Sequence, residues 1–291
     1  MYLQATAKIN LSLDVLGTRA DGYHDVRMVM QMVGMYDRLE LTPEKGKPGI
    51  RFTTNLSYLP TDRSNLAVRA AQMLMEEFGV TDGLRIHLHK FIPVSAGLAG
   101  GSSDAAQTMI GVNRLFRLGL DRKGLMERGR SIGADVPFCI LGGTALSEGI
   151  GEKLTPLPAM DRTDVLLCKP PVNVSTKDVY ASFDRLPAVE HPDIDAQIAG
   201  IRAHDLTAVT DARAMRNVLE AVTGAACPVI GQIEDQMMAD GARRAVMSGS
   251  GPTVFGLYDD HAKAEDARLR LKRIFPQART FLTWTENRRK G

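Results

Sequence analysis

Hydrophobic and polar residues alternate strictly near the start of the chain. Between residues 4 and 15 every second residue, from Ala5 to Val15, is apolar, and the residues from Thr6 to Asp14 between them are polar. A period of two predicts a strand with one buried face. The same alternation predicts a strand over 84–88, and an apolar-rich segment predicts one over 28–41.

Apolar positions at helical spacing predict the remaining elements of the first half. Helices are expected over 65–78, 103–117 and 122–132, with Gly133 ending the last one. Residues 155–164 contain two prolines and indicate a domain boundary. Beyond it we expect helices over 176–183, 195–208, 212–223, 230–240 and 262–274, and strands over 165–168, 244–248, 253–258 and 278–285. Strands and helices mix in both halves, which predicts two α+β domains over 1–157 and 158–291.

Composition narrows the class of protein. The 291 residues are 44% apolar with a formal net charge of +2, which suits buried cores and gives no large basic field. The three cysteines lack metal-ligand spacing, and no apolar run is long enough to cross a membrane. The basic tail Arg288, Arg289 and Lys290 is interpreted as a solvated end. We expect a cytoplasmic protein without a signal peptide, membrane or nucleic-acid partner, and the oligomeric state stays open.

A glycine-rich segment at 93–106 carries the clearest functional signal. It follows the strand at 84–88, and its residues Ser102, Ser103 and Asp104 are suited to cap the next helix. The order strand, small-residue loop, helix N-terminus directs N–H groups at one point, where phosphate binds well. A flexible surface loop is the alternative. The segment lacks the lysine of a P-loop, and its glycine spacing does not fit a dinucleotide fingerprint.

Three further features could carry chemistry. Lys8 and Asn10 share the polar face of the first strand, where a lysine is otherwise an ordinary edge residue. Asp135 precedes Val136-Pro137, so we expect an extended, irregular segment there. Asp135 is then either a turn or cap residue or a carboxylate that takes a proton from a hydroxyl. The block 247–253 is either a tight turn between strands or a second surface for phosphate.

Together these blocks resemble the GHMP kinase superfamily. The matching pieces are 7–11, 21–24, 64–66, 93–106, 133–138, 169–170, 175–176 and 248–253. The resemblance implies an N-terminal domain like domain 2 of ribosomal protein S5, a ferredoxin-like C-terminal domain and a site between them. It also implies an ATP-dependent small-molecule kinase. The blocks 7–11, 21–24 and 133–138 resemble those of the family members that act in non-mevalonate isoprenoid synthesis. The resemblance implies that the chain phosphorylates the C2 hydroxyl of 4-(cytidine 5'-diphospho)-2-C-methyl-D-erythritol.

The resemblance also implies roles for individual residues. Asp135 would be the catalytic base, and Lys8 would keep it ionised and neutralise developing charge. The ATP phosphates would lie along a loop made of Pro93, Val94, Ser95, Ala96, Gly97, Leu98, Ala99, Gly100, Gly101, Ser102 and Ser103. The cytidine base would be held by Tyr23, His24 and Tyr180, and other substrate groups by Asn10 and Thr176.

Three expectations about ATP remain. Asn65 matches an adenine-side contact, but it suits a helix cap equally well. Magnesium should accompany ATP, bound mostly by phosphate oxygens and water, with no assigned protein ligand; Ser102, Ser103 and Asp104 are only candidates. Many superfamily members have glycine where this chain has Ser95, Ala96 and Ala99, and the alanine at 99 argues against a positive φ there.

Rival functions come from three classes. Another GHMP kinase, of the homoserine or mevalonate type, would have no use for Tyr23, His24 and Tyr180 as a base-binding set. A non-catalytic ligand sensor on the same fold would not need Lys8 and Asp135. A nucleotide-dependent oxidoreductase is disfavoured by the glycine spacing.

Overall fold

The N-terminal half builds a mixed sheet around two long strands. The computed structural model describes residues 1–287, so the basic tail at 288–290 lies outside the described residues. The strands are β1 (Tyr2–Thr18), β2 (His24–Glu44), β3 (Ile50–Thr54), β4 (Gly83–His89), β5 (Thr144–Gly149) and β6 (Lys153–Pro156). They are ordered β3-β4-β2-β5-β6, and β1 pairs with β2 in antiparallel register. One strand, β2, thus carries neighbours along almost its whole length.

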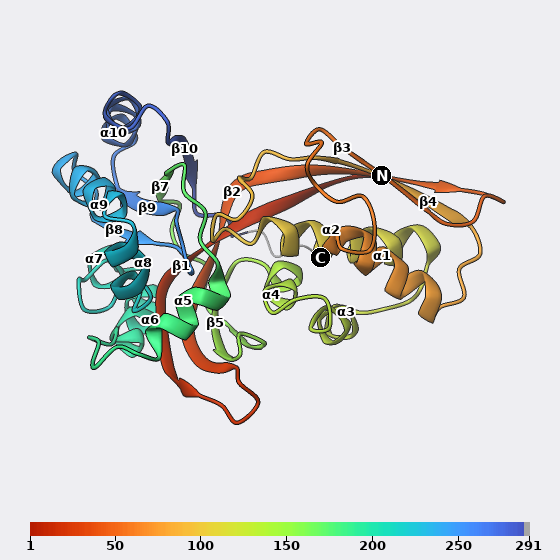
Figure 1. Cartoon of the computed structure of the whole chain (residues 1–291), viewed down its shortest axis with the longest axis horizontal. Coiled ribbons are helices and arrows are strands. Elements are labelled where there is room, and N and C mark those ends of the chain that lie inside the picture. Colours follow the sequence, from red (N-terminus) through yellow and green to blue (C-terminus); the bar gives the residue numbers. More distant parts are fainter. Residues whose placement is uncertain (288–291) are drawn as a thin grey trace.

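Four helices cover one face of this sheet (Figure 1). They are α1 (Leu66–Glu77), α2 (Gly100–Phe116), α3 (Arg122–Gly129) and α4 (Val136–Leu141). Their apolar sides bury residues such as Leu74 and Met109 against Leu41 and Ile86 of the sheet. This packing fixes α2, and with it the glycine-rich loop that enters α2.

The C-terminal half has a β-α-β-β-α-β plan with inserted helices. Its elements are β7 (Asp164–Lys169), α5 (Thr176–Phe183), α6 (Ile194–Ala203), α7 (Leu206–Val209), α8 (Glu220–Ala226), α9 (Val229–Ala239), β8 (Arg244–Met247), β9 (Val254–Tyr258), α10 (His261–Ile274) and β10 (Arg279–Trp284). The antiparallel sheet runs β10-β7-β9-β8, and this order is the ferredoxin-like arrangement.

The two halves share buried apolar residues. Ile9 and Val29 of the first sheet lie in one cluster with Leu167 and Phe255 of the second. Backbone bridges also join Leu13 to Asn217 and Val33 to Thr285. Because β1 and β2 extend to the C-terminal elements (Figure 1), apolar residues of these strands such as Leu13 and Met28 pack with Leu166 where the two halves meet.

Several predicted boundaries were wrong. The helix expected over 122–132 ends at Gly129, so Gly133 does not end it. The helix expected over 195–208 is two helices, because His204 adopts a left-handed conformation with φ 56° and Asp205 caps a new start. The helix expected over 212–223 begins only at Glu220. The pattern also missed the elements β3, β5, β6 and α4.

Two further observations concern the cysteines and the helices that could cross a membrane. Cys139, Cys168 and Cys227 form no disulfide in the described part of the chain. Within residues 1–287, no helix combines the length and apolar character that crossing a membrane requires.

Candidate active site

The glycine-rich loop is held against the turn at 248–251. Ser248 Oγ donates a hydrogen bond to the Gly97 carbonyl at 3.0 Å, and the Lys8 backbone N–H donates to the Leu98 carbonyl at 3.1 Å. Gly97 has φ +74°, and a Cβ there would lie 2.1 Å from the Ser248 carbonyl oxygen. A glycine is therefore required at 97 for the two Gly-rich segments to touch.

The helix behind the loop starts earlier than predicted. Ala99 is the N-cap of α2 in left-handed conformation, with φ 53° and no side-chain capping bond. The predicted caps Ser102, Ser103 and Asp104 instead lie inside the helix, and Ser103 and Asp104 are buried, so that prediction was wrong. The expectation that alanine would exclude a positive φ at 99 was also wrong, and Ser95 adopts φ 51° as well. The first N–H groups of α2, which have no partner within the helix, face the loop.

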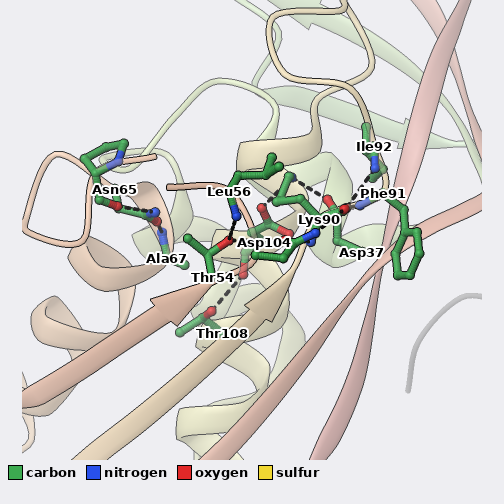
Figure 2. Close-up of polar contacts among 12 residues, drawn as sticks. Asp37, Thr54, Leu56, Asn65, Ala67, Lys90, Phe91, Ile92, Asp104 and Thr108 are labelled. Atoms are coloured by element: carbon green, nitrogen blue, oxygen red, sulfur yellow. Dashed lines mark hydrogen bonds and ion pairs between the residues drawn. The ribbon is translucent and has the colours of Figure 1, made fainter. Parts of the chain in front are cut away.

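A buried ion cluster joins the two ends of the loop. Lys90, just before the loop, donates from Nζ to Asp104 Oδ2 at 2.7 Å and also to Asp37 Oδ2 (Figure 2). The other Asp37 oxygen accepts the backbone N–H groups of Phe91 at 2.6 Å and Ile92 at 2.9 Å. The residues just before the loop and the first turns of α2 are therefore fixed to β2 before any ligand binds.

The surroundings of this cluster shift the pKa values of Asp104 and Lys90. Burial raises the pKa of Asp104 well above its ordinary value, and the ammonium of Lys90 only partly opposes this. Asp37 Oδ1 accepts two backbone N–H groups, whereas Asp104 Oδ1 is buried with no partner in the described structure. Burial alone would lower the pKa of Lys90, but the two carboxyl groups outweigh it and raise that pKa. Burial and the unpartnered Oδ1 therefore both favour the protonated form of Asp104.

One cavity of about 800 Å³ brings most of the predicted site residues together. Those that line it are Lys8, Asn10, Tyr23, His24, Gly97, Ala99, Ser102, Asp135, Thr176 and Tyr180. The other loop residues, Pro93 to Ala96, Leu98, Gly100, Gly101 and Ser103, do not form part of its wall, and neither does Asn65. The loop therefore opens into the cavity only through its last turn and the start of α2.

Lys8 and Asp135 reach the cavity from different elements. Lys8, on β1, is 4% exposed, and its Nζ donates to Asn10 Oδ1 at 2.5 Å and to the Gly97 carbonyl at 3.1 Å. Asp135 is the N-cap of α4, but its side chain makes no capping bond. Among residues 1–287, no ion pair joins Lys8 to Asp135, although both side chains line the same cavity.

The local structure around Asp135 differs from the prediction. Val136 does not extend the chain but begins α4, with Pro137 in the first turn. Proline is tolerated there because the N–H it lacks has no helical partner in the first turn. The half-buried Asp135 is thus set at a helix start, not in an irregular segment.

Aromatic rings gather at another part of the cavity. The rings of His24 and Tyr180 lie 4.7 Å apart between centroids, at an interplanar angle of 36°. His24 Nε2 lies 2.7 Å from Asp184 Oδ1, and this hydrogen bond lowers the pKa of Asp184. Burial raises the pKa of Tyr180 to about 12, with Asp135 adding to the effect, so its hydroxyl stays protonated. Tyr23, 61% exposed, completes the group.

Comparison with known proteins identifies the family. Residues 65–143 match the GHMP kinases N terminal domain, and residues 197–277 match the GHMP kinases C terminal family. This chain belongs to the GHMP kinase family. A protein of Lachnospira eligens named 4-diphosphocytidyl-2-C-methyl-D-erythritol kinase is 52% identical over 260 residues, covering 89% of this chain and 88% of that protein. One from Alkaliphilus metalliredigens with the same name is 44% identical, covering 100% and 98%.

Solved structures agree with this membership. A crystal structure of 4-(cytidine 5'-diphospho)-2C-methyl-D-erythritol kinase matches with a TM-score of 0.83 and 33% identity, covering 99% of this chain and 100% of that one. A homoserine kinase from Cytophaga hutchinsonii matches with a TM-score of 0.77 at 19% identity, covering 100% and 96%. The second likeness shows the fold alone. The two-domain GHMP kinase fold predicted from the sequence is confirmed.

Asn65 has a structural role in this GHMP kinase. Its Oδ1 accepts the Ala67 N–H at 3.0 Å, which caps α1, and its Nδ2 donates to the Pro60 carbonyl at 2.9 Å (Figure 2). The structure therefore confirms that Asn65 caps a helix, which was one of the two roles that the sequence left open. The adenine contact at Asn65 stays a prediction.

Sequence reasoning missed several residues of the cavity wall. Lys177 and Asp184 lie on the same face of α5 as Tyr180, and Ser250 Oγ lies 2.8 Å from Thr176 Oγ1. The helical spacing of 177, 180 and 184 was readable from the sequence and could have found the two charged residues.

Proposed function

We propose that this GHMP kinase transfers the γ-phosphoryl group of ATP to the C2 hydroxyl of 4-(cytidine 5'-diphospho)-2-C-methyl-D-erythritol. One observation carries the proposal. A single cavity is lined by the Lys8–Asp135 pair, by the last turn of the glycine-rich loop and by the aromatic set Tyr23, His24 and Tyr180. The names of relatives that align over nearly the whole chain support the same substrate.

The loop suits the phosphates of ATP. Gly97, Ala99 and Ser102 form the part of the cavity wall where α2 begins, and a helix start favours negative charge. The Lys90 cluster fixes this backbone in advance, so binding need not order it. The loop would thus hold the phosphate chain, with Lys8 beside it at the edge of the cavity.

Asp135 acts as the general base. The substrate hydroxyl donates its proton to the Asp135 carboxylate as the hydroxyl oxygen forms a bond to the γ-phosphorus, and the bond from that phosphorus to the ADP oxygen breaks. Positioning and charge stabilisation dominate such a transfer. The Lys8 ammonium neutralises negative charge at the transferred group, and Asn10 and the Gly97 carbonyl hold it in place.

Magnesium would accompany ATP and neutralise its phosphate oxygens. Of the three candidate ligands, Ser103 is fully buried and Asp104 is bonded to Lys90, so only Ser102 borders the cavity. No cluster of three or more His, Cys, Asp or Glu suited to a metal occurs in residues 1–287. Phosphate oxygens and water would therefore supply most of the ligands.

The cytosine ring is recognised at the aromatic set. Tyr180 and Tyr23 offer faces for stacking, which is worth about 1–3 kcal/mol per base in nucleic-acid sites. The Asp184 contact fixes the orientation of the His24 ring. Homoserine and mevalonate offer no ring to this part of the cavity.

A coupled ADP-release assay tests the proposal. The wild type is given the cytidine diphosphate alcohol, its truncated form without cytidine, homoserine and mevalonate. We expect turnover of the first and strong loss with the others. Asp135→Asn and Lys8→Ala should lower kcat by about 100- to 10,000-fold with circular dichroism unchanged. Equal turnover of the full and truncated alcohols would refute the substrate, and variants that keep more than about a third of wild-type kcat would refute the base.

A further inference from the structure

One face of helix α5 is turned toward the cavity. Lys177, Tyr180, Ala181 and Asp184 all line it, at the i, i+3, i+4, i+7 spacing of a single helix face. Tyr180 and Asp184 serve the aromatic end, where Asp184 contacts His24. Lys177 lies one turn nearer the start of α5, beside Thr176, which contacts Ser250.

Lys177 differs from the other cation of the cavity. The lysines and arginines of the wall are Lys8 and Lys177. Lys8 is buried and makes two hydrogen bonds. Lys177 is exposed, and its ammonium makes no hydrogen bond or ion pair within the described part of the chain. It is therefore the cation that is available to a ligand.

The position of Lys177 is unfavourable for the helix itself. It lies in the first turn of α5, where the helix dipole favours negative side chains, and Asp178 in the same turn follows that rule. Lys177 adds positive charge where the helix is already positive. A bound anion facing the cavity would relieve this conflict.

The proposed substrate carries an anion at the corresponding place. In the proposed function, its cytosine binds against Tyr180 and His24, and its reacting hydroxyl lies near Asp135 and Lys8. The diphosphate links these two parts, so it must span the cavity from Tyr180 toward Lys8. Thr176 and Lys177 lie one turn before Tyr180 on α5, Thr176 contacts Ser250, and a Cβ at the adjacent Gly249 would lie 3.5 Å from Lys8 Nζ. We propose that Lys177 binds the diphosphate group of the substrate and selects for a charged cytidine ligand. This inference rests on the proposed function.

Competitive inhibition by cytidine, CMP and CDP tests it. The variants are Lys177→Met, which keeps the stem length, Lys177→Arg, which keeps the charge, and Lys272→Met, a control on the exposed side of α10 away from the cavity. We expect Lys177→Met to raise the inhibition constant of CDP about tenfold and to leave that of cytidine unchanged. The KM of the substrate should rise similarly, with kcat within about twofold. Lys177→Arg should retain most of the CDP affinity, and Lys272→Met should match the wild type.

Two results would overturn the inference. Equal CDP inhibition of wild type and Lys177→Met would show that the ammonium does not meet the diphosphate. Equal loss of cytidine and CDP would show that Lys177 only supports the base-binding face of α5. Wild-type turnover of the cytidine diphosphate alcohol tests the proposed function separately, so the two failures are distinguishable.

Discussion

Replacing Lys90 with methionine is expected to lower both stability and ATP affinity. Methionine has a similar length but no charge, so the variant leaves the buried carboxyl groups of Asp37 and Asp104 without their ammonium partner. Removing one member of a buried ion pair costs about 3–5 kcal/mol. For a protein of this size, such a loss corresponds to a fall in Tm of about 10 °C.

The effect on ATP follows from the place of the cluster. Lys90 links the residue before the loop to Asp104 in α2, and the Asp37 carboxylate holds the N–H groups of Phe91 and Ile92. The methionine removes the contact from Lys90 to Asp104 and the ammonium partner of Asp37, so ligand binding must order the start of α2, and we expect binding of a non-hydrolysable ATP analogue to weaken about tenfold. Affinity for CDP should stay unchanged, because Lys90 does not line the cavity.

Asp104→Asn is the matched control. Since burial favours the protonated form of Asp104, an amide in its place keeps a neutral group of the same size and the acceptor for Lys90. We expect a cost of about 1 kcal/mol, the usual value of one hydrogen bond. Thermal unfolding followed by circular dichroism and calorimetric titration with the ATP analogue measure both effects. A Lys90→Met variant with wild-type Tm and ATP affinity would refute the reasoning. An Asp104→Asn variant as damaged as Lys90→Met would contradict the preference of Asp104 for its protonated form.

Two further substitutions follow from the structure. Gly97→Ala should lower ATP affinity and kcat strongly, because its methyl group would lie 2.1 Å from the Ser248 carbonyl, whereas Gly101→Ala, whose methyl group meets nothing closer than 3.6 Å, should bind ATP nearly as the wild type does. Titration with an ATP analogue compares them, and equal behaviour would contradict the close approach at 97. Burial and the neighbouring Glu220 raise the pKa of Glu234 from 4.5 to about 9. The folded state therefore keeps a proton that the unfolded state has lost, and stability falls as pH rises through this window, by up to about 1.4 kcal/mol per pH unit. Glu234→Gln should raise Tm more at pH 8.5 than at pH 5, and an equal rise at both pH values would count against the shift.

The periodic elements were predictable from sequence because one face of each is buried. The alternation at 4–15 gave β1, and the helical spacing at 176–183 gave α5 with the same bounds. The helix predicted over 212–223 was wrong at its start because tertiary contacts determine the backbone conformation there. Asn217 donates to the carbonyls of Met247 and Gly249 and bridges to Leu13, so the chain before Glu220 is held beside β1 and cannot be helical.

The sequence predicted which residues form the candidate site, but not the local backbone or the buried contacts that position them. Motifs placed Lys8, Asp135 and the aromatic group in one site, and the cavity contains them all. The prediction at Asp135 failed locally because the rule for residues before proline is a bias, and a helix start is where proline is tolerated. Nothing in the sequence indicated that Lys90 forms buried ion pairs, since a lysine after an alternating strand is ordinarily solvated. Only the fold brings Asp37 and Asp104 to it.

The conformation of Ala99 shows why local preference could not describe the loop. A left-handed backbone costs an alanine about 1–2 kcal/mol, so the sequence argued against a positive φ. The surrounding contacts oppose that cost. The Leu98 carbonyl accepts from the Lys8 N–H, the Ala99 carbonyl accepts the Ser103 N–H, and Lys90 and Asp104 fix the two ends of the loop. Contacts distant in sequence therefore hold the backbone in the conformation that turns the start of α2 toward the cavity, and the alanine accepts the strain.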